Sequence, residues 1–493
     1  MGSVCPSVKA ACDQLADLDA ELDRLTASSA LEDCEVVRLA VSDPPPIDLP
    51  AALTAALAKP VGTPPLRNLA TGRHSAVIIT SDATRATPSR EMIGPVMEEL
   101  ACGGIGTDGV DVVIGVGAHR PAGRDEIERL LGAEWAARLR VTNHDARAAD
   151  LVDVGRTARG TRVLLNRRVA EADLCIAFGQ VEPHEFAGFT GGRKAILPAV
   201  AGYETIVRNH GLDMLCNASA RPGVLYGNPI HEEMLEAARL AGLHFIVNVA
   251  LDRHLRPVAV AAGDPRAAHE QLVHFLRSQC TLPTPARPPS AIITGPGQPL
   301  DINLYQTVKA LVGIEPLLDM DYGTAPRPVV VLLSRCWDGG GSEEMFEPFL
   351  QVCEHHHPVT MTGVSPEARA VSEAALARLH RNYTIEKDES YYVARVTPKC
   401  RRVIACCPGV PDERLRVLGW EPAADCDSAV TQALRLIRSC GADEPGNSAY
   451  EDEPPRVMLC PRPQRALFGP LQLGVDMRVI RHRFAADGYL PTP

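Results

Sequence analysis

Short apolar runs alternate with longer amphipathic segments along most of this chain. The runs 76–80, 110–114 and 174–178 are rich in Val, Ile, Leu and Ala, and each ends in a polar or glycine-rich stretch. Segments such as 89–101 and 125–131 between them have helical character. Strands that alternate with helices are typical of parallel sheets. Ligands in such sheets bind beyond the carboxyl ends of the strands, where these polar stretches fall.

A proline-rich segment, 282–289, indicates a boundary between two such regions. After it, apolar runs at 291–294, 329–333, 403–406 and 457–460 predict the strands of a second sheet. Residues 441–455 are acidic and proline-rich, which predicts a loop. The fold class is therefore α/β, with two open α/β domains.

Leucines at helical spacing near the start of the chain precede the break Pro44-Pro45-Pro46, which favours an N-terminal extension. We expect an extension at 1–46, an N-terminal α/β domain at 47–285 and a C-terminal α/β domain at 290–460. The remaining segment, 461–493, can return to the N-terminal domain.

Composition excludes several classes of protein. Hydrophobic residues at 45% and charged residues at 23% are ordinary for a globular enzyme, and a net charge of -11 without a basic run argues against nucleic acid or an anionic membrane as partner. No apolar run is long enough to cross a bilayer. Fifteen cysteines without zinc-site spacing favour reduced thiols and a cytoplasmic location.

Chemistry is most concentrated at 181–198 and in the following pair Asn209-His210. This region holds His184, His210, Lys194 and a glycine run that includes Gly191 and Gly192. Two imidazoles, a lysine able to form a covalent link and a backbone that can approach a ligand indicate an active site. The alternative is a glycine turn with an incidental lysine. A P-loop is disfavoured because Arg193 stands between the glycines and Lys194.

Two further loops follow predicted strands. In 81–88, hydroxyls, backbone N–H groups and Arg85 can converge on a phosphate or carboxylate. A helix cap by Thr87 before Pro88 explains the end of the motif without a ligand, but it does not explain Asp82 with Arg85. In 115–121 the third glycine of the dinucleotide fingerprint is missing, so His119 is better interpreted as an acid/base group, with a structural histidine as the alternative.

Other histidines carry weaker signals. The tract 355–357 lacks a carboxylate partner and is interpreted as a group of surface histidines without a function. The spacing of His269 and His274 does not fit a zinc-protease helix. In the second domain Tyr305, Gln306 and Lys309 lie within one helical turn and can present three polar groups to one ligand, or they can be a solvated helix start.

Taken in order, these motifs resemble the nickel-pincer lactate racemase family. The resemblance rests on five segments and runs from about residue 60 to the C-terminus. The segments are Asp82-x-Thr84-Arg85, Gly117-x-His119-Arg120, Pro183-His184-x-Phe186-x-Gly188-Phe189-x-Gly191-Gly192-x-Lys194, Asn209-His210 and Leu304-Tyr305-Gln306-x-x-Lys309. Ala86 and Ala199 depart from residues that are common in the family, and neither position has a proposed chemical role.

The resemblance implies a racemase or epimerase of lactate or a related 2-hydroxy acid, with its active site in the cleft between the domains. It implies a nickel-pincer nucleotide attached to Lys194, nickel bound by His210, and cofactor-synthesis proteins as partners. His119 and His184 match the acid/base pair. Cofactor contacts are implied for Thr84, Gly191 and Gly192, and substrate contacts for Asp82, Arg85, Tyr305, Gln306 and Lys309.

Hydride transfer is the implied chemistry, since it avoids a carbanion next to a carboxylate, and two histidines allow either face of the planar 2-keto acid to be served. Two alternatives stay open at this point. One is a nucleotide- or phosphate-binding α/β protein without nickel, and the other is a nicotinamide-dependent 2-hydroxy acid dehydrogenase.

Overall fold

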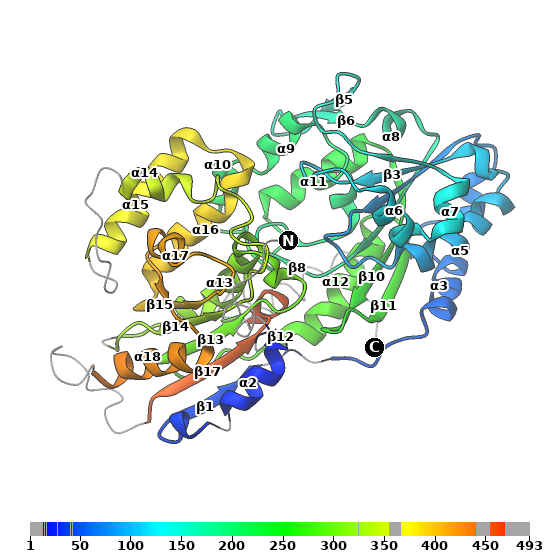
Figure 1. Cartoon of the computed structure of the whole chain (residues 1–493). Helices are drawn as coiled ribbons and strands as arrows, with labels where there is room; N and C mark the ends of the chain where they lie inside the picture. The colour runs from blue at the N-terminus through cyan, green and yellow to red at the C-terminus, as the bar shows by residue number, and fades with distance from the viewer. Residues whose placement is uncertain are drawn as a thin grey trace. The chain divides into compact units, whose positions relative to one another are not determined.

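The computed structural model describes residues 13, 15, 17–26, 28–39, 41, 43–323, 325–353, 366–439 and 454–468. The chain divides into two compact units (Figure 1). One is continuous and comprises Ser42–Cys280, and the other combines Met1–Val41 with Thr281–Pro493. We call them the central unit and the terminal unit. Both are built on a sheet with helices, which confirms the predicted α/β class.

The central unit contains a six-stranded sheet in the order β11-β10-β7-β2-β3-β4. Its strands are parallel, except that β11 pairs antiparallel with β10. The strands predicted at 76–80, 110–114 and 174–178 are confirmed as β2, β3 and β7. The bounds are β2 Ala76–Ser81, β3 Val110–Gly115, β4 Arg140–Asn143, β7 Leu174–Gln180, β10 Leu243–Leu251 and β11 Pro257–Gly263.

Alternation along these strands separates two faces of the sheet. Ile78, Val112, Ile176 and Val247 belong to one apolar cluster, in which they meet leucines of α3 (Leu49–Ala58) and methionines of α5 (Ser89–Cys102). The other helices are α4 Leu66–Ala70, α6 Arg124–Leu131, α7 Ala133–Arg138, α8 Arg167–Glu171, α9 Tyr203–Asn209, α10 Leu212–Leu215, α11 Pro229–Leu240 and α12 Ala267–Cys280. Two hairpins, β5 Val152–Arg156 with β6 Arg162–Leu165 and β8 Pro183–His184 with β9 Gly188–Phe189, complete the unit.

The order of the strands fixes where a ligand can bind in the central unit. From β2 the chain continues outward to β3 and β4, and it then returns to place β7 on the other side of β2. The strand order therefore reverses between β2 and β7, and open α/β sheets bind ligands beyond the carboxyl ends at such a point. The loops that begin at Asp82, Val116 and Val181 leave β2, β3 and β7 at this edge.

The terminal unit contains a parallel six-stranded sheet in the order β1-β17-β13-β14-β15-β16. The four strands predicted for the second half of the chain are confirmed. The bounds are β1 Glu35–Arg38, β13 Ala291–Gly295, β14 Val329–Leu333, β15 Arg402–Cys406, β16 Glu421–Pro422 and β17 Arg456–Pro461. Its helices are α2 Leu18–Thr26, α13 Leu304–Leu318, α14 Glu347–Cys353, α15 Pro366–Asn382, α16 Asp388–Val396, α17 Asp412–Val417 and α18 Cys426–Arg438, and β12 Thr281–Leu282 pairs with β18 Leu467–Phe468.

Within the segment 1–46, which was expected to be an extension, the described residues up to Val41 belong to the terminal unit and residues 43–46 to the central unit, which corrects the prediction. β1 is a parallel neighbour of β17, with Val36 opposite Val457. Leu18, Leu22 and Leu25 are buried in the apolar cluster of that sheet. Their helical spacing marks a face that packs into a core, and sequence alone does not identify the core that receives it.

Three expectations fall outside the described residues: most of the loop at 441–455, the histidine tract 355–357 and the course of the chain after residue 468. Of 461–493, the described part lies in the terminal unit, where β18 pairs with β12.

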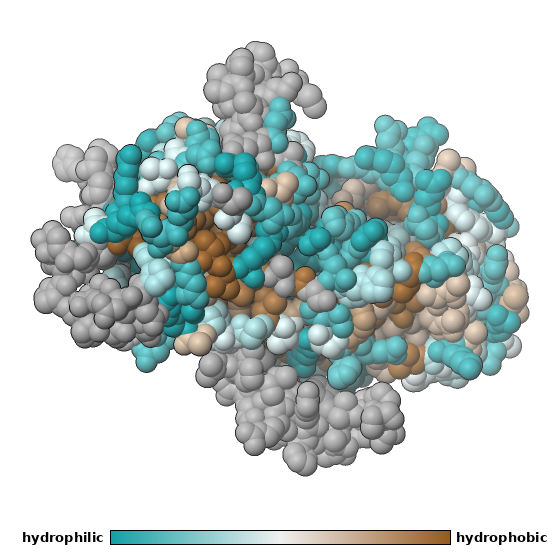
Figure 2. Space-filling model, turned by 90° about the horizontal axis from the view of Figure 1, so that it is seen from below, coloured by the Kyte–Doolittle hydropathy of each residue, from teal (hydrophilic) through white to brown (hydrophobic). Residues whose placement is uncertain are grey.

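Hydrophobic side chains on the visible face form patches bordered by hydrophilic ones (Figure 2). Among the described residues the large hydrophobic side chains with high exposure are Tyr226, Leu255 and Trp337. No helix in the described part of the chain is both long enough and apolar enough to cross a membrane. The cysteines whose side chains the structure describes are free thiols.

Candidate active site

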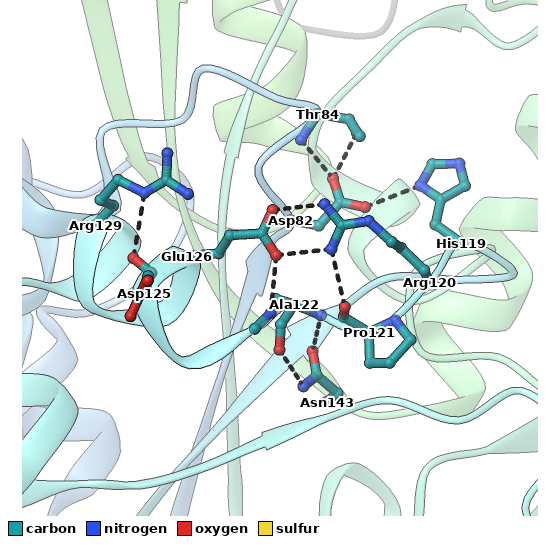
Figure 3. A network of polar contacts seen from close by, with 11 residues as sticks. Asp82, Thr84, His119, Arg120, Pro121, Ala122, Asp125, Glu126, Arg129 and Asn143 are labelled. Atoms are coloured by element: carbon teal, nitrogen blue, oxygen red, sulfur yellow. Dashed lines mark hydrogen bonds and ion pairs between the residues drawn. The ribbon is translucent and has the colours of Figure 1, made fainter. Parts of the chain in front are cut away.

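The first group of candidate residues lies at the ends of β2 and β3 (Figure 3). Nδ1 of His119 lies 2.9 Å from Oδ2 of Asp82, and the backbone N–H of Thr84 donates to Oδ1 of Asp82 at 3.0 Å. The Thr84 hydroxyl donates to the same Oδ1. Asp82 is buried, whereas the side chain of His119 is 55% exposed. A carboxylate that accepts from Nδ1–H leaves Nε2 of the imidazole to accept a proton.

The electrostatics of Asp82 favour its ionised form. Burial alone would raise the pKa of this carboxyl, but hydrogen bonds from His119 and Thr84, with the charge of Arg85, lower the pKa below its ordinary value. Asp82 therefore remains a carboxylate at neutral pH. The guanidinium of Arg85 donates to the carbonyl of Thr84 at 3.3 Å.

The loop that carries His119 is held on both sides. Arg120 forms two hydrogen bonds of 2.7 Å with Glu126, visible in Figure 3, and the pKa of Glu126 is lowered to about 2, mainly by Arg120 and then by the N–H of Gly123. On the other side, the N–H of Gly117 donates to the carbonyl of Ala199 at 2.9 Å. The second contact ties the end of β3 to the loop that carries Lys194.

No side-chain hydrogen bond caps α5, which begins at Ser89. The Thr87 hydroxyl instead accepts from Ser81 at 2.7 Å. The interpretation of Thr87 as the side-chain cap of this helix is therefore wrong, and the hydroxyls of Ser81 and Thr87 bind each other.

The second group gathers around the ring of Phe186. His184 contacts this ring edge-on with centroids 4.5 Å apart, and His210 does so at 5.0 Å. Nζ of Lys194 lies 5.3 Å from the same ring centroid. Nδ1 of His184 also lies 3.2 Å from Oε2 of Glu185. His184 and Lys194 of one motif and His210 of the next are thus brought to one aromatic side chain.

His210 is buried at the end of α9 and is held in its neutral form. Burial, together with the charge of Lys194, lowers its pKa to about 3. Its backbone N–H donates to the carbonyl of Ile206 at 2.8 Å, while Nδ1 is buried without a hydrogen-bond partner. An imidazole that is neutral and has an orphaned nitrogen has the chemistry of a metal ligand.

The backbone of the glycine run has a conformation and close contacts that leave no room for a side chain. Gly191 has φ of +78°, and a Cβ there would lie 2.8 Å from Oδ1 of Asn248. The same Oδ1 accepts from the N–H of Gly192 at 2.8 Å. Asn248 is a polar residue inside the apolar run of β10, which is the one sequence signal that could have identified it.

Arg193 and His269 form a support that sequence reasoning missed. The Arg193 guanidinium is fully buried and donates to the carbonyl of Ala187 at 2.7 Å and to Nε2 of His269 at 2.8 Å. His269 was considered above only as a zinc ligand. Its ring lies 3.1 Å from the position of a Cβ on Gly192, so it packs directly against the glycine run.

Tyr305, Gln306 and Lys309 lie in the first turns of α13, in the terminal unit. Asn303 caps this helix by accepting from the N–H of Gln306 at 3.0 Å. The Tyr305 hydroxyl donates to Asp388 at 2.6 Å, and Oε1 of Gln306 is buried without a partner. The predicted helix start is confirmed, and one buried amide oxygen there has no hydrogen-bond partner.

Comparison with known proteins identifies the family to which this chain belongs. Residues 24–223 match the model of the lactate racemase N-terminal domain, and residues 286–440 match that of the lactate racemase C-terminal domain. The lactate racemase of Thermoanaerobacterium thermosaccharolyticum is 36% identical over 386 residues, which span 78% of this chain and 85% of that protein. This chain belongs to the lactate racemase family. It is an enzyme of the isomerase class.

Other members agree with the assignment. The lactate racemase of Lactiplantibacillus plantarum is 34% identical over 297 residues, covering 60% of this chain and 68% of that one. The lactate racemase apoprotein of T. thermosaccharolyticum superposes with a TM-score of 0.73 at 28% identity, over 88% of this chain and 95% of that structure. A Thermotoga maritima protein shares the fold alone, with a TM-score of 0.57 at 14% identity over 87% of this chain and 100% of that one. Family membership favours a racemase over the two alternatives left open by the sequence.

Proposed function

We propose that this family member interconverts stereoisomers of lactate or a related 2-hydroxy acid, using a nickel-pincer nucleotide carried on Lys194. The observation that carries the proposal is the pairing of His119 with the buried carboxylate of Asp82 at the strand-order reversal, since it presents an oriented imidazole where a ligand would bind. The printed names of the relatives, lactate racemase, supply the substrate class.

The residues present fit the proposed cofactor. His210 is neutral and buried, with an unpartnered Nδ1, and it shares the ring of Phe186 with Lys194. An imidazole of this kind suits Ni(II). We therefore assign covalent attachment to Lys194 and nickel coordination to His210, with Thr84, Gly191 and Gly192 as contacts to the nucleotide. When bound, this group supplies a hydride acceptor and donor.

The protein's own part is orientation and proton transfer. Asp82 fixes the tautomer of His119, so that Nε2 takes the proton of the substrate hydroxyl while the bond between C2 and its hydrogen is broken. His184 plays the equivalent part for the other enantiomer. When the 2-keto acid is reduced to the opposite enantiomer, the other histidine, in its protonated form, donates the proton to the new hydroxyl group, and the two histidines exchange protons with solvent before the next turnover. Two bases are needed because the two enantiomers present their hydroxyl groups differently.

Binding of the carboxylate is assigned to Arg85, whose guanidinium can donate two hydrogen bonds to one carboxylate. Asp82 was expected to contact the substrate, but both of its oxygens are engaged by His119 and Thr84, so we propose that it acts through His119. Tyr305, Gln306 and Lys309 are proposed as substrate-binding residues of the terminal unit.

The test uses protein co-expressed with cofactor-synthesis proteins and no added nicotinamide. Enantiopure lactate, malate and larger 2-hydroxy acids deuterated at C2 are the substrates. Isomerisation that keeps deuterium at C2 is expected, together with a modified Lys194 in the peptide map and with nickel that is lost in His210→Ala. Complete exchange of C2 deuterium with solvent would refute the hydride route, and active protein with an unmodified Lys194 would refute the attachment.

A further inference from the structure

Three polar residues at the start of α11 are buried, although the first turn of a helix is normally a place for exposed polar side chains. Asn228, His231 and Glu233 are 0%, 6% and 1% exposed. α11 packs against η3 (Gly192–Ala195), which contains Lys194, and against α9, whose last residue directly precedes His210. None of the three was singled out from the sequence, and the proposed reaction does not use them.

Asn228 caps the start of α11 and also binds two backbone carbonyls outside the helix. Its Oδ1 accepts from the N–H groups of Ile230 and His231 at 3.1 and 3.3 Å, which is the ordinary function of an N-cap. Its Nδ2 donates to the carbonyl of Phe186 at 2.8 Å and to that of Val224 at 2.9 Å. A cap needs only the first pair of contacts. The second pair fixes the segment that carries His184 and the Phe186 ring.

Glu233 is a buried carboxylate without a basic partner among the described residues. Oε1 accepts from the Thr157 hydroxyl at 2.9 Å, and Oε2 accepts from Nδ2 of Asn209 at 2.9 Å. Asn209 is itself fully buried and directly precedes His210. Burying a carboxylate is unfavourable, and an apolar residue would pack the helix equally well. The contact with Asn209 therefore indicates a role in placing the end of α9.

His231 lies on α11, which packs against η3, the segment that contains Arg193 and Lys194. Burial, and then the charge of Arg193, keep the pKa of His231 well below its ordinary value, so its imidazole is neutral. Arg193 directly precedes Lys194 and donates to the carbonyl of Ala187 at 2.7 Å. One end of one helix thus reaches all three loops that carry the second group of candidate residues.

We propose that Asn228 and Glu233 are positioning residues, which use the start of α11 to hold the segments of His184 and His210 in a fixed mutual arrangement. The role of these loops rests on the proposed function, but the arrangement itself can be measured without cofactor. Residues that orient metal ligands at one remove commonly change metal affinity by about 10–100-fold when they are replaced.

Two variants separate the contacts. Glu233→Gln keeps the shape of the side chain and its contact with Thr157. It replaces the carboxylate that faces the Asn209 amide with a second amide. Glu232→Gln is the matched control, because Glu232 stands next to Glu233 in the sequence, is exposed, and undergoes the same chemical change. Asn228→Ser keeps a side-chain cap but cannot reach Phe186. The double variant Asn209→Asp with Glu233→Gln exchanges carboxylate and amide, and it tests the pair itself.

The first measurement uses cofactor-free protein with ¹⁵N-labelled histidine, with ring signals assigned by the His119→Ala, His184→Ala and His210→Ala variants. We expect Glu233→Gln to move the His210 signals and leave those of His119 in place. Asn228→Ser should move the His184 signals. The exchanged pair should bring the His210 signals back towards their original positions.

The second measurement is nickel retention in cofactor-loaded protein, where Glu233→Gln should weaken nickel binding about 10-fold with the Lys194 adduct intact. Ring signals of Glu233→Gln and Asn228→Ser that match those of wild type and of Glu232→Gln would overturn the proposal. If Glu233→Gln does not fold, His184 signals that stay unmoved in Asn228→Ser are sufficient to overturn the proposal. Wild-type protein without nickel or adduct would instead defeat the proposed cofactor, while the ring signals still decide the positioning role.

Discussion

Replacement of Asp82 by asparagine tests the proposed acid/base role most directly, because the structure dictates how the amide must sit. The N–H and the hydroxyl of Thr84 both donate to Oδ1 of Asp82. In Asp82→Asn the amide oxygen therefore remains next to Thr84, and the new NH₂ group faces Nδ1 of His119. Nδ1 must then accept, which places the ring proton on Nε2. That nitrogen can no longer take the proton of the substrate hydroxyl.

The expected loss can be bounded from the same geometry. A positioned general base contributes about 10²–10⁴-fold, which is about 2.7–5.4 kcal/mol at about 1.36 kcal/mol per tenfold. The equivalent change beside the histidine of serine proteases lowers kcat by about 10⁴. Here the side chain of His119 is 55% exposed, so water and ring rotation can recover part of the function. We therefore expect a loss of about 10²–10³-fold.

The assay follows both enantiomers of the best substrate by chiral chromatography, with nickel content and Lys194 adduct measured on each preparation. Since enantiomers have equal free energies, kcat/KM must fall equally in both directions. Glu128→Gln is the control: it makes the same kind of chemical change in the exposed pair with Arg124, which does not hold the loop of His119, and it should retain most of the activity. A fully loaded Asp82→Asn protein whose racemisation rate is within about twofold of this control would refute the assigned role of Asp82.

Three further predictions concern stability and the glycine run. Leu22→Ala should destabilise the protein by about 2–5 kcal/mol in denaturant unfolding, since Leu22 is fully buried; an unchanged midpoint would mean that α2 is not part of the core. Arg456 and then Arg287 lower the pKa of Glu35 from 4.5 to about 2, so its stabilisation is present above pH 4.5 and disappears as the pH falls towards 2. Glu35→Gln should therefore lower Tm modestly at pH 7 and not at pH 2, and a gap independent of pH would contradict this. Gly191→Ala should cost about 1–3 kcal/mol more than Gly160→Ala, whose φ is also positive but which has no neighbour within 4 Å; equal costs would show that contact with Asn248 is unimportant.

Much of the fold could be predicted because strand patterns are local. The apolar runs at 76–80 and 329–333 are short, buried and bounded by polar residues, so their type and their bounds follow from the sequence. The leucines of α2 were correctly seen as helical but assigned to an extension, because the core that buries them is formed by strands more than 250 positions away. Periodicity identifies the apolar face of a helix and carries no information about its partner.

The same distinction applies to the site. His119, His184, Lys194 and His210 could be identified because each stands in a motif of unusual composition. The buried groups that hold them could not. Arg193 was seen only as a departure from a P-loop, and Glu233 resembles any acidic residue at a helix start, because burial and hydrogen-bond partners are properties of the folded chain.

The pairing of β1 with β17 has a consequence for the order in which the chain can fold. β17 follows β1 by more than 400 residues, and the whole of the central unit is made between them. During synthesis the central unit is complete in sequence at Cys280, whereas the leucines of α2 and the edge of β1 have no partners until β13 and then β17 have been made. The segment that forms α2 and β1 is therefore synthesised before the central unit and is among the last parts of the described chain to be buried. A ribosome that stops within the terminal unit leaves a finished central unit attached to an apolar segment that exposes aggregation-prone surface.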